Sequence, residues 1–313
     1  MTDSFPLRIG TRGSPLALAQ AHDVRDRLIA ADPVLAGDGM LAIEIIKTTG
    51  DMVLDRPLAD VGGKGLFSKE IDEALLDGRV DLAVHSLKDL ETWMPDGIAL
   101  TCVLEREDPR DVFISDKAAS LDDLPAGSVV GTSSLRRQAQ ILRRRPDLKV
   151  ETFRGNVQTR MRKLADGEAD ATLLALAGLR RLGMTEVATE ILDPDVLLPA
   201  VAQGAVGVTC RAGDAGIAAR LEALKHETTW RRVSAERAML AALDGSCRTP
   251  IGGLAEIAAD GTMTLRGLVA KADGSEIFET TRTGAVEDAG EAEALGRDAG
   301  EDLRRQAGPG FPV

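Results

Sequence analysis

The chain has 313 residues, of which 44% are hydrophobic and 28% charged, and its formal net charge is −12. This length exceeds one ordinary core and fits two or three domains of roughly 100 to 150 residues each. Aromatic residues make up only 3% and tyrosine is absent, which disfavours a stacking platform for single-stranded nucleic acid. The acidic total also repels duplex phosphates, so we expect no nucleic-acid partner.

No targeting or membrane segment is apparent. Residues 1–5 are polar and lead directly into a strand-like run, unlike the apolar stretch of a signal peptide. No run of 18 apolar residues occurs, so we expect no membrane-spanning helix. The three cysteines, Cys102, Cys210 and Cys247, lie far apart and form no CxxC pair. This pattern fits a reducing cytoplasm and excludes a disulfide framework, and the three scattered histidines predict no metal site.

Strand-like and helical runs alternate over the first 210 residues. The expected strands are Leu7–Gly10, Ile43–Thr48, Leu82–His85, Ile98–Leu104, Asp111–Ile114, Ser128–Gly131, Lys149–Phe153, Ala171–Leu174 and Gly207–Cys210. The expected helices between them include Pro15–Ala30, Phe67–Asp77, Leu135–Arg144, Val157–Ala165 and Ala177–Leu182. Such alternation is typical of α/β units with parallel sheets.

After Trp230 the pattern changes. A helix over Trp230–Ala242 precedes three alternating strands and a closing acidic helix, which predicts a small α+β domain. The strands and the last helix are expected at Gly253–Ala258, Met263–Ala270, Glu276–Thr283 and Val286–Gln306.

Two similar loops indicate that the first part of the chain holds two α/β domains. Gly10–Ser14 and Gly131–Ser134 each follow a strand and lead into a helix. We therefore expect an α/β protein with two such domains and a small C-terminal α+β domain. The expected boundaries are 1–104 with 201–226 for the first domain, 105–200 for the second and 227–313 for the third.

The first of these loops contains Arg12-Gly13-Ser14-Pro15. Ser14 is a favourable N-cap and Pro15 a favourable first helical residue. The free amide groups and positive dipole end of the helix behind them suit an anion, with Arg12 beside them. A capped helix with a surface arginine is the simpler alternative, and this loop alone favours it.

A strongly basic segment follows the second loop. Residues 136–163 carry ten lysines and arginines against two acidic residues, a net charge of +8 within an acidic chain. Such a reversal of sign indicates a site for a ligand with several carboxylates or phosphates. Arg143–Arg145 read as a solvated helix face, whereas Arg154 ends an apolar strand just before a turn.

Two further polar clusters lie in the first domain. Lys64 belongs to the glycine-rich segment 62–68, which is either a mobile flap over a ligand or an ordinary loop. Asp89 and Lys88 follow the apolar strand that ends at His85. Catalytic groups gather at such strand ends, so Asp89 is the acid–base or electrostatic candidate and Lys88 its counterion. We read His85 as a structural histidine.

Cys247 differs from the other two cysteines. Cys102 and Cys210 lie in apolar strands, where small buried cysteines are common. Cys247 instead lies in a turn-rich loop next to Arg248, where a thiolate is exposed and favoured.

Together, these motifs resemble the porphobilinogen deaminase family over essentially the whole chain. The resemblance rests on the order and spacing of Arg8–Ala17, Lys64–Phe67, His85–Asp89, Gly131–Arg137, Arg154–Val157, Ala202–Ala205 and Gly245–Cys247. It implies two domains like type 2 periplasmic binding proteins and a third domain. It also implies head-to-tail condensation of four porphobilinogen molecules, with release of ammonia, to give 1-hydroxymethylbilane in tetrapyrrole biosynthesis.

The resemblance further implies a dipyrromethane cofactor bound by a thioether to Cys247, and Asp89 as the catalytic residue. Cofactor-binding residues by resemblance are Ser86, Lys88, Thr132, Ser134, Arg136, Arg137, Arg154 and Gly155. Substrate-binding residues are Arg12, Ser14, Lys64, Phe67, Arg160, Arg181 and Gln203. We expect a cytoplasmic monomer that passes its product to uroporphyrinogen-III synthase. The run Leu90–Pro95 departs from the family pattern, particularly at Trp93.

The ligand chemistry agrees with this interpretation, because porphobilinogen carries an acetate and a propionate and a growing chain accumulates carboxylates. A carboxylate in a partly dry cleft stabilises the cations formed when ammonia leaves, which suits Asp89. The alternatives are a solute-binding module made of two α/β lobes and an RNA-binding protein that uses the basic segment. The first needs neither a third domain nor a loop cysteine, and the acidic total disfavours the second.

Overall fold

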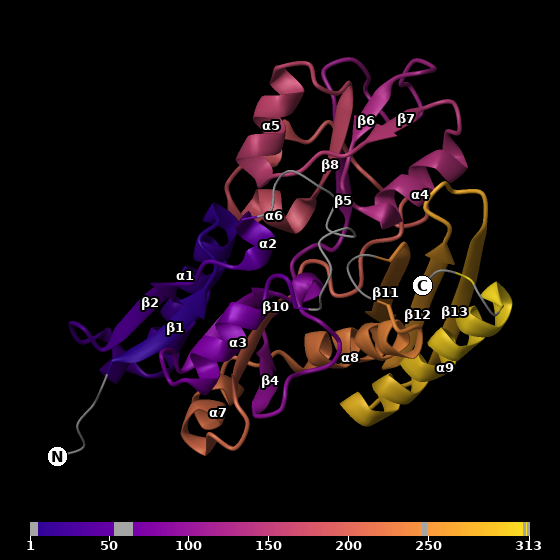
Figure 1. Cartoon of the computed structure of the whole chain (residues 1–313). Coiled ribbons are helices and arrows are strands. Elements are labelled where there is room, and N and C mark those ends of the chain that lie inside the picture. The colour runs from indigo at the N-terminus through magenta and orange to yellow at the C-terminus, as the bar shows by residue number, and fades with distance from the viewer. Residues whose placement is uncertain (1–5, 53–64, 246–248, 309–310, 312–313) are drawn as a thin grey trace. The chain divides into compact units, whose positions relative to one another are not determined.

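The computed structural model describes residues 6–52, 65–245, 249–308 and 311. The chain forms two compact units. The first contains residues 6–52, 65–106 and 205–230, and the second contains residues 107–204 and the described residues from 231 onward. The first unit has one five-stranded sheet, and the second has a five-stranded and a three-stranded sheet (Figure 1).

The sheet of the first unit is mixed. Its order is β2-β1-β3-β10-β4, formed by Leu41–Ile45, Leu7–Thr11, Leu82–Ser86, Val206–Arg211 and Ile98–Val103. β1 is parallel to β2 and β3, whereas β10 is antiparallel to β3 and β4. The prediction of a parallel sheet is therefore wrong for β10. The chain re-enters this unit at the edge where β3 ends, so Val206 pairs with Ser86 and β10 runs backward.

Helices cover both faces of this sheet. α1 (Pro15–Ala31) and α7 (Ala215–Glu222) pack on one face, and α3 (Lys69–Leu76) packs on the other. Alternate residues of β3 supply the two cores, with Leu82 and Val84 in the first and Ala83 in the second. The short helix α2 (Thr49–Met52) follows β2.

The first sheet of the second unit is also mixed. Its order is β7-β6-β8-β5-β9, formed by Lys149–Glu151, Val129–Gly131, Ala171–Ala175, Asp111–Ile114 and Glu190–Ile191. β6 is parallel to β7 and β8, and β5 is antiparallel to β8 and β9. Its helices are α4 (Leu135–Arg144), α5 (Val157–Ala165) and α6 (Leu176–Arg181). One core includes Ile141 of α4, and the other includes Leu179 of α6 and half-buried residues of α5.

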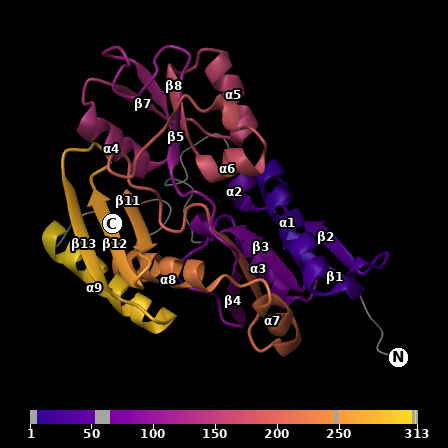
Figure 2. The same cartoon turned by 180° about the vertical axis from the view of Figure 1, so that it is seen from behind.

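The C-terminal part of this unit is an antiparallel sheet with two helices. β11 (Ile251–Ile257), β12 (Thr262–Ala270) and β13 (Ile277–Ala285) pair in sequence order. α8 spans Glu227–Ala242, and α9 (Ala289–Ala307) lies along β12 and β13 (Figure 2). α9 approaches α8 closely at Gly296, where a Cβ atom would lie 2.1 Å from the carbonyl oxygen of Ala235.

The predicted fold class, two α/β parts followed by a small C-terminal α+β part, is confirmed. The bounds of α4 and α5 match the prediction, whereas α7 and the two-residue strand β9 were not predicted. The division into three domains stays a prediction, because the second unit holds both later sheets. Within the described residues, no helix is long and apolar enough to cross a membrane.

Candidate functional site

One group of polar residues lies at the carboxyl edge of the first unit's sheet. β1, β2 and β3 are parallel, so the segments that follow them begin at the same edge. These segments contain Arg12 after β1, Asp51 after β2 and Asp89 after β3. Asp89 ends a 3-10 turn, Leu87–Asp89.

Arg12 joins the two carboxylates of this edge. Its guanidinium makes a bidentate ion pair with Asp51, with Nε 3.0 Å from Oδ2, and its Nη1 lies 3.7 Å from Oδ2 of Asp89. Burial lowers the pKa of Arg12, but the bonds from Asp51 and the charge of Asp89 raise it more. Burial likewise raises the pKa of Asp51, and Arg12 and Thr48 together bring it below its usual value. Asp89 is 32% exposed, which leaves its carboxylate open to a ligand.

An aromatic ring covers the same guanidinium. Arg12 Cζ lies 4.2 Å from the ring centroid of Phe67, a cation–π contact. The ring packs directly against Gly50, where a Cβ atom would lie 2.3 Å from Cε1 of Phe67. Any larger residue at position 50 therefore displaces the ring from Arg12.

The other predicted residues of this unit have structural contacts as well. Ser14 accepts a hydrogen bond from the amide of Ala17 and caps α1. Ser86, at the end of β3, exchanges hydrogen bonds with the side chain of Gln20 at 2.9 and 3.1 Å. His85 is buried and lies 3.0 Å from the Thr209 hydroxyl, which confirms its interpretation as a structural histidine.

A second group lies at the corresponding edge of the second unit's five-stranded sheet. β6 and β8 end at this edge, and the antiparallel strand β5 begins there, since Asp111 pairs with Ala175. Asp111 is fully buried. Ser134 caps α4 immediately after β6, and its own amide donates to the hydroxyl of Thr132.

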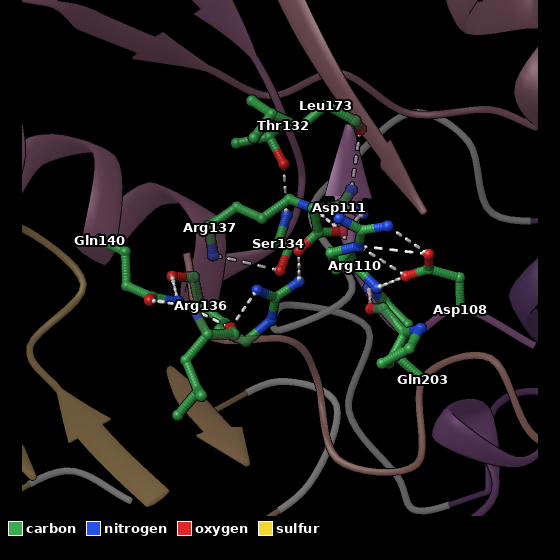
Figure 3. Close-up of polar contacts among 12 residues, drawn as sticks. Asp108, Arg110, Asp111, Thr132, Ser134, Arg136, Arg137, Gln140, Leu173 and Gln203 are labelled. Atoms are coloured by element: carbon green, nitrogen blue, oxygen red, sulfur yellow. Dashed lines mark hydrogen bonds and ion pairs between the residues drawn. The ribbon is translucent and has the colours of Figure 1, made fainter. Parts of the chain in front are cut away.

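Asp111 holds two buried arginines from the first turn of α4 (Figure 3). Nη2 of Arg136 lies 2.8 Å from its Oδ2, and Nη2 of Arg137 lies 2.6 Å from its Oδ1. The guanidiniums also donate to the carbonyl oxygens of Leu198 and Leu173, at 2.6 and 2.9 Å. The two arginine side chains are only 4% and 6% exposed.

The charge of this cluster is not balanced. Two guanidiniums meet one carboxylate, which leaves a buried formal charge of +1. The pKa of Arg136 lies below its usual value, because burial and the charge of Arg137 lower it more than Asp111 raises it. Burial raises the pKa of Asp111, but the two arginines outweigh burial and hold it well below its usual range. Among the described residues, Nε of Arg136 and the buried hydroxyl of Ser133 have no hydrogen-bond partner. These donors fit a ligand carboxylate.

The remaining predicted residues of the second unit lie in the loops and helices that follow its strands. Gly155 adopts a φ of 122°, and its carbonyl accepts a hydrogen bond from Nε of Arg160. Arg154 is half-buried just before this turn. Gln203 donates to Asp111 at 3.0 Å, and Arg181 donates to the Gly204 carbonyl at 2.8 Å.

The structure divides the basic segment into two kinds of arginine. Arg143 and Arg144 are exposed, and Arg144 pairs with Asp122, which confirms their interpretation as a solvated helix face. That interpretation is wrong for Arg145, whose side chain is only 16% exposed and donates to Asp147 and to three backbone carbonyl oxygens. Arg136 and Arg137 are instead buried on Asp111. Counting charges within residues 136–163 therefore overstates the positive field, because the partners Asp111 and Asp122 lie outside that range.

Sequence reasoning missed Asp51 and Asp111. Both had a readable signal: Thr48-Thr49-Gly50-Asp51 is a polar cluster after a strand, and Asp111 is a charge that opens an apolar strand. Lys64 and Cys247, predicted to bind substrate and cofactor, lie outside the described residues.

Comparison with known families identifies the class of protein. The family model described as "Porphobilinogen deaminase, dipyromethane cofactor binding domain" matches residues 7–219. A second, "Porphobilinogen deaminase, C-terminal domain", matches residues 230–305. The chain belongs to the porphobilinogen deaminase family, enzymes of tetrapyrrole biosynthesis, and carries its dipyrromethane-binding domain.

Curated relatives agree. "Porphobilinogen deaminase, chloroplastic" of Oryza sativa subsp. japonica is 59% identical over 97% of this chain and 85% of its own length. "Porphobilinogen deaminase" of Nitrobacter winogradskyi is 58% identical over 97% of this chain and 94% of its own. Among solved structures, the methionine-binding protein MetQ is distantly similar, with a TM-score of 0.44 and 14% identity over 71% of this chain and 89% of that one.

Proposed function

We propose that the enzyme condenses four porphobilinogen molecules head-to-tail, with release of ammonia, to give 1-hydroxymethylbilane. The observation that carries this proposal is the buried cluster of Arg136, Arg137 and Asp111, whose formal charge is +1. A ligand carboxylate balances that charge, and the unpartnered Nε of Arg136 and hydroxyl of Ser133 are donors suited to such groups. A cofactor and substrate that carry an acetate and a propionate on every ring supply such carboxylates.

In this proposal the dipyrromethane is bound by a thioether to Cys247. The protein holds its carboxylates through charged and hydroxyl-bearing residues and the turn at Gly155. These are Ser86 and Lys88 in the first unit and Thr132, Ser134, Arg136, Arg137 and Arg154 in the second. When bound, the dipyrromethane supplies the pyrrole carbon to which substrate units are added. Because Asp111 and two carbonyl oxygens fix both buried guanidiniums, they bind an anion with little reorganisation.

Asp89 is the proposed catalytic residue. Its carboxylate is partly exposed and only loosely paired with Arg12, so it is able to accept a hydrogen bond from a pyrrole N–H group. The same charge stabilises the cation that substrate forms when ammonia leaves. Arg12 and Asp51 fix the arrangement of this edge, and Asp51 competes with a substrate carboxylate for Arg12.

The remaining substrate contacts are assigned to residues of both units that supply cations, a hydroxyl, an amide and a ring: Arg12, Ser14, Lys64, Phe67, Arg160, Arg181 and Gln203. We further propose a cytoplasmic monomer of three domains, with residues 227–313 carrying the cofactor loop. Its product passes to uroporphyrinogen-III synthase.

Intact-mass spectrometry tests the proposal. Protein expressed with a working pathway should exceed the mass of the chain by one dipyrromethane and react with Ehrlich's reagent. The Cys247→Ala variant should fold, show the bare mass, give no colour and make no linear tetrapyrrole. Cys210→Ala is the matched control. Because Cys210 is buried within β10, this variant should carry the same adduct as the wild type. An unmodified wild-type mass, or product from Cys247→Ala, would contradict the proposal.

A further inference from the structure

The carbonyl oxygen of Leu198 accepts a hydrogen bond from Arg136, although Leu198 belongs to no helix or strand. Leu198 is buried in the segment between β9 and β10 and directly precedes Pro199. Proline restricts the preceding residue to extended conformations. Leu198 nevertheless lacks the ladder of hydrogen bonds that fixes the peptide groups of a strand, so another group must hold its carbonyl in place.

The side chain of Gln140 supplies that support. Its Oε1 accepts a hydrogen bond from the amide of Leu198 at 2.7 Å, and its Nε2 donates to the carbonyl oxygen of Leu198 at 3.1 Å. The side-chain amide thus pairs with Leu198 as a neighbouring strand would. Gln140 is only 8% exposed and lies one turn after Arg136 on α4, where its Nε2 is 3.3 Å from the Arg136 carbonyl oxygen (Figure 3).

The Leu198 carbonyl helps to orient the guanidinium of Arg136. Nη1 lies 2.6 Å from this oxygen, and Nη2 lies 2.8 Å from Oδ2 of Asp111. The third nitrogen, Nε, has no partner among the described residues. Because a guanidinium is planar, two fixed contacts determine where its Nε–H points, whereas one contact lets the plane turn. The position of the carbonyl therefore sets the direction of the donor that remains for a ligand.

The C-terminal sheet confines the same carbonyl from another element. A Cβ atom at Gly252 of β11 would lie 3.2 Å from the Leu198 carbonyl oxygen. The amide of Gly253 donates to the carbonyl oxygen of Pro199 at 2.9 Å. All of these residues belong to the second unit. A side chain at position 252 would therefore press on the oxygen that Gln140 holds.

We propose that Gln140 is a positioning residue for the condensation: through Leu198 it directs the Nε–H of Arg136 toward a cofactor carboxylate. The inference rests on the proposed function, in which Arg136 binds the dipyrromethane and Cys247 holds it covalently. A misdirected Arg136 should then slow the reaction without releasing the cofactor, since small displacements of positioning groups cost large factors in rate. Substrate affinity should change little, because Arg136 is not among the assigned substrate contacts.

The first test is steady-state kinetics of the Gln140→Met holoenzyme, with kcat expressed per molecule that carries the cofactor. Methionine has a similar length but neither accepts from the Leu198 amide nor donates to its carbonyl. We expect kcat to fall at least tenfold and KM to stay within twofold. Gln138→Met makes the same change in a half-buried residue of the same helix, on a side chain to which Leu198 does not donate. This control should keep both constants within twofold.

Proton exchange measured by NMR separates positioning from a general loss of structure. In the wild-type holoenzyme the Nε–H of Arg136 should exchange slowly with water, because a ligand carboxylate accepts from it. Gln140→Met should accelerate this exchange at least tenfold. The Nε–H of Arg137, which lies 3.2 Å from Oδ1 of Asp111, should change less than twofold. Equal acceleration of both signals would indicate a merely structural role and overturn the proposal.

Gly252→Ala displaces the Leu198 carbonyl without altering Gln140, and it decides the question if Gln140→Met does not fold. It should lower kcat at least threefold and leave KM within twofold. Gly284→Ala is its control on the same sheet, since a Cβ atom there lies 3.4 Å from a side-chain carbon of Leu295. An unchanged kcat in either Gln140→Met or Gly252→Ala would overturn the proposal. Product formation by the wild type tests the proposed function separately, because this inference concerns only ratios of variant to wild type.

Discussion

The two α/β units place charged residues at the same position in the sheet but arrange them oppositely. In the first unit, one guanidinium meets two carboxylates that are each about a third exposed, so the set of Arg12, Asp51 and Asp89 carries −1. In the second, Arg136, Arg137 and the fully buried Asp111 carry +1. The strand topology fixes where a site forms, whereas the excess charge decides whether it suits a cation or an anion.

A second parallel lies in how each edge is packed. Gly50 faces the ring of Phe67, and Gly131 faces the ring of Phe153, where a Cβ atom would lie 2.5 Å from Cγ. A cation lies over each ring: Arg12 at 4.2 Å from the Phe67 centroid and Lys163 at 5.4 Å from the Phe153 centroid. The rings differ in burial, since Phe153 is only 3% exposed and Phe67 is half-buried.

We call the set of Arg12, Asp51 and Asp89 the negative edge. The comparison predicts that its exposed carboxylate, Asp89, serves turnover and not stability. Asp89→Asn should lower kcat by about 10²–10⁴-fold, because a neutral amide neither stabilises a cation nor moves a proton. The cofactor mass and the melting temperature should stay unchanged, because the contact with Arg12 is 3.7 Å long and partly exposed. Asp96→Asn, at an exposed position of the following segment, is the control. Near-normal product formation would remove Asp89 from its role.

We call the set of Arg136, Arg137 and Asp111 the positive edge, and we expect its buried carboxylate to contribute strongly to stability. Asp111→Asn leaves two buried guanidiniums without a counterion, which should lower the free energy of unfolding by about 3–5 kcal/mol. Urea denaturation measures this change, and mass spectrometry should show reduced cofactor content in the folded fraction. Asp122→Asn removes the surface partner of Arg144 and should cost less than about 1 kcal/mol. Equal effects of the two variants would contradict the assigned role of Asp111.

Local signals explain what the sequence predicted correctly. Ser134 and Asn156 cap α4 and α5, whose bounds were predicted to the residue. The strand β10 was predicted, but its antiparallel direction and the strand β9 were not, because pairing across the sheet determines them. The partners of Arg136 and Arg137 were also missed. Asp111 precedes them by 25 and 26 residues, and no periodic pattern links these positions.

Alanine substitutions at Gly131 and Gly50 should reveal the different burial of the rings of Phe153 and Phe67. Gly131→Ala should lower the free energy of unfolding by about 1–3 kcal/mol, since the buried Phe153 ring cannot move aside. Gly50→Ala should cost less stability, because Phe67 is able to swing outward, but it should raise KM as the ring leaves Arg12. Adding Phe153→Leu to Gly131→Ala should restore part of the lost stability. A larger stability loss from Gly50→Ala would contradict this ranking.

The smallest expected effect concerns Asp51, the counterpart of Asp111 in the first unit, whose side chain is 31% exposed. Asp51→Asn should lower the free energy of unfolding by about 1 kcal/mol or less at pH 7. Burial opposes ionisation, but Arg12 holds the folded pKa of Asp51 below its usual 3.8. Its contribution is therefore present above about pH 4 and lost as the pH falls through the folded pKa.

Urea midpoints of wild type and Asp51→Asn should thus differ equally at pH 7 and pH 5, and converge only below pH 4. The gap produced by Asp111→Asn should persist to lower pH, because two arginines hold that carboxylate ionised. If the Asp51 gap already closed between pH 7 and pH 5, its pKa would be raised. The ion pair with Arg12 would then not be what holds the negative edge together.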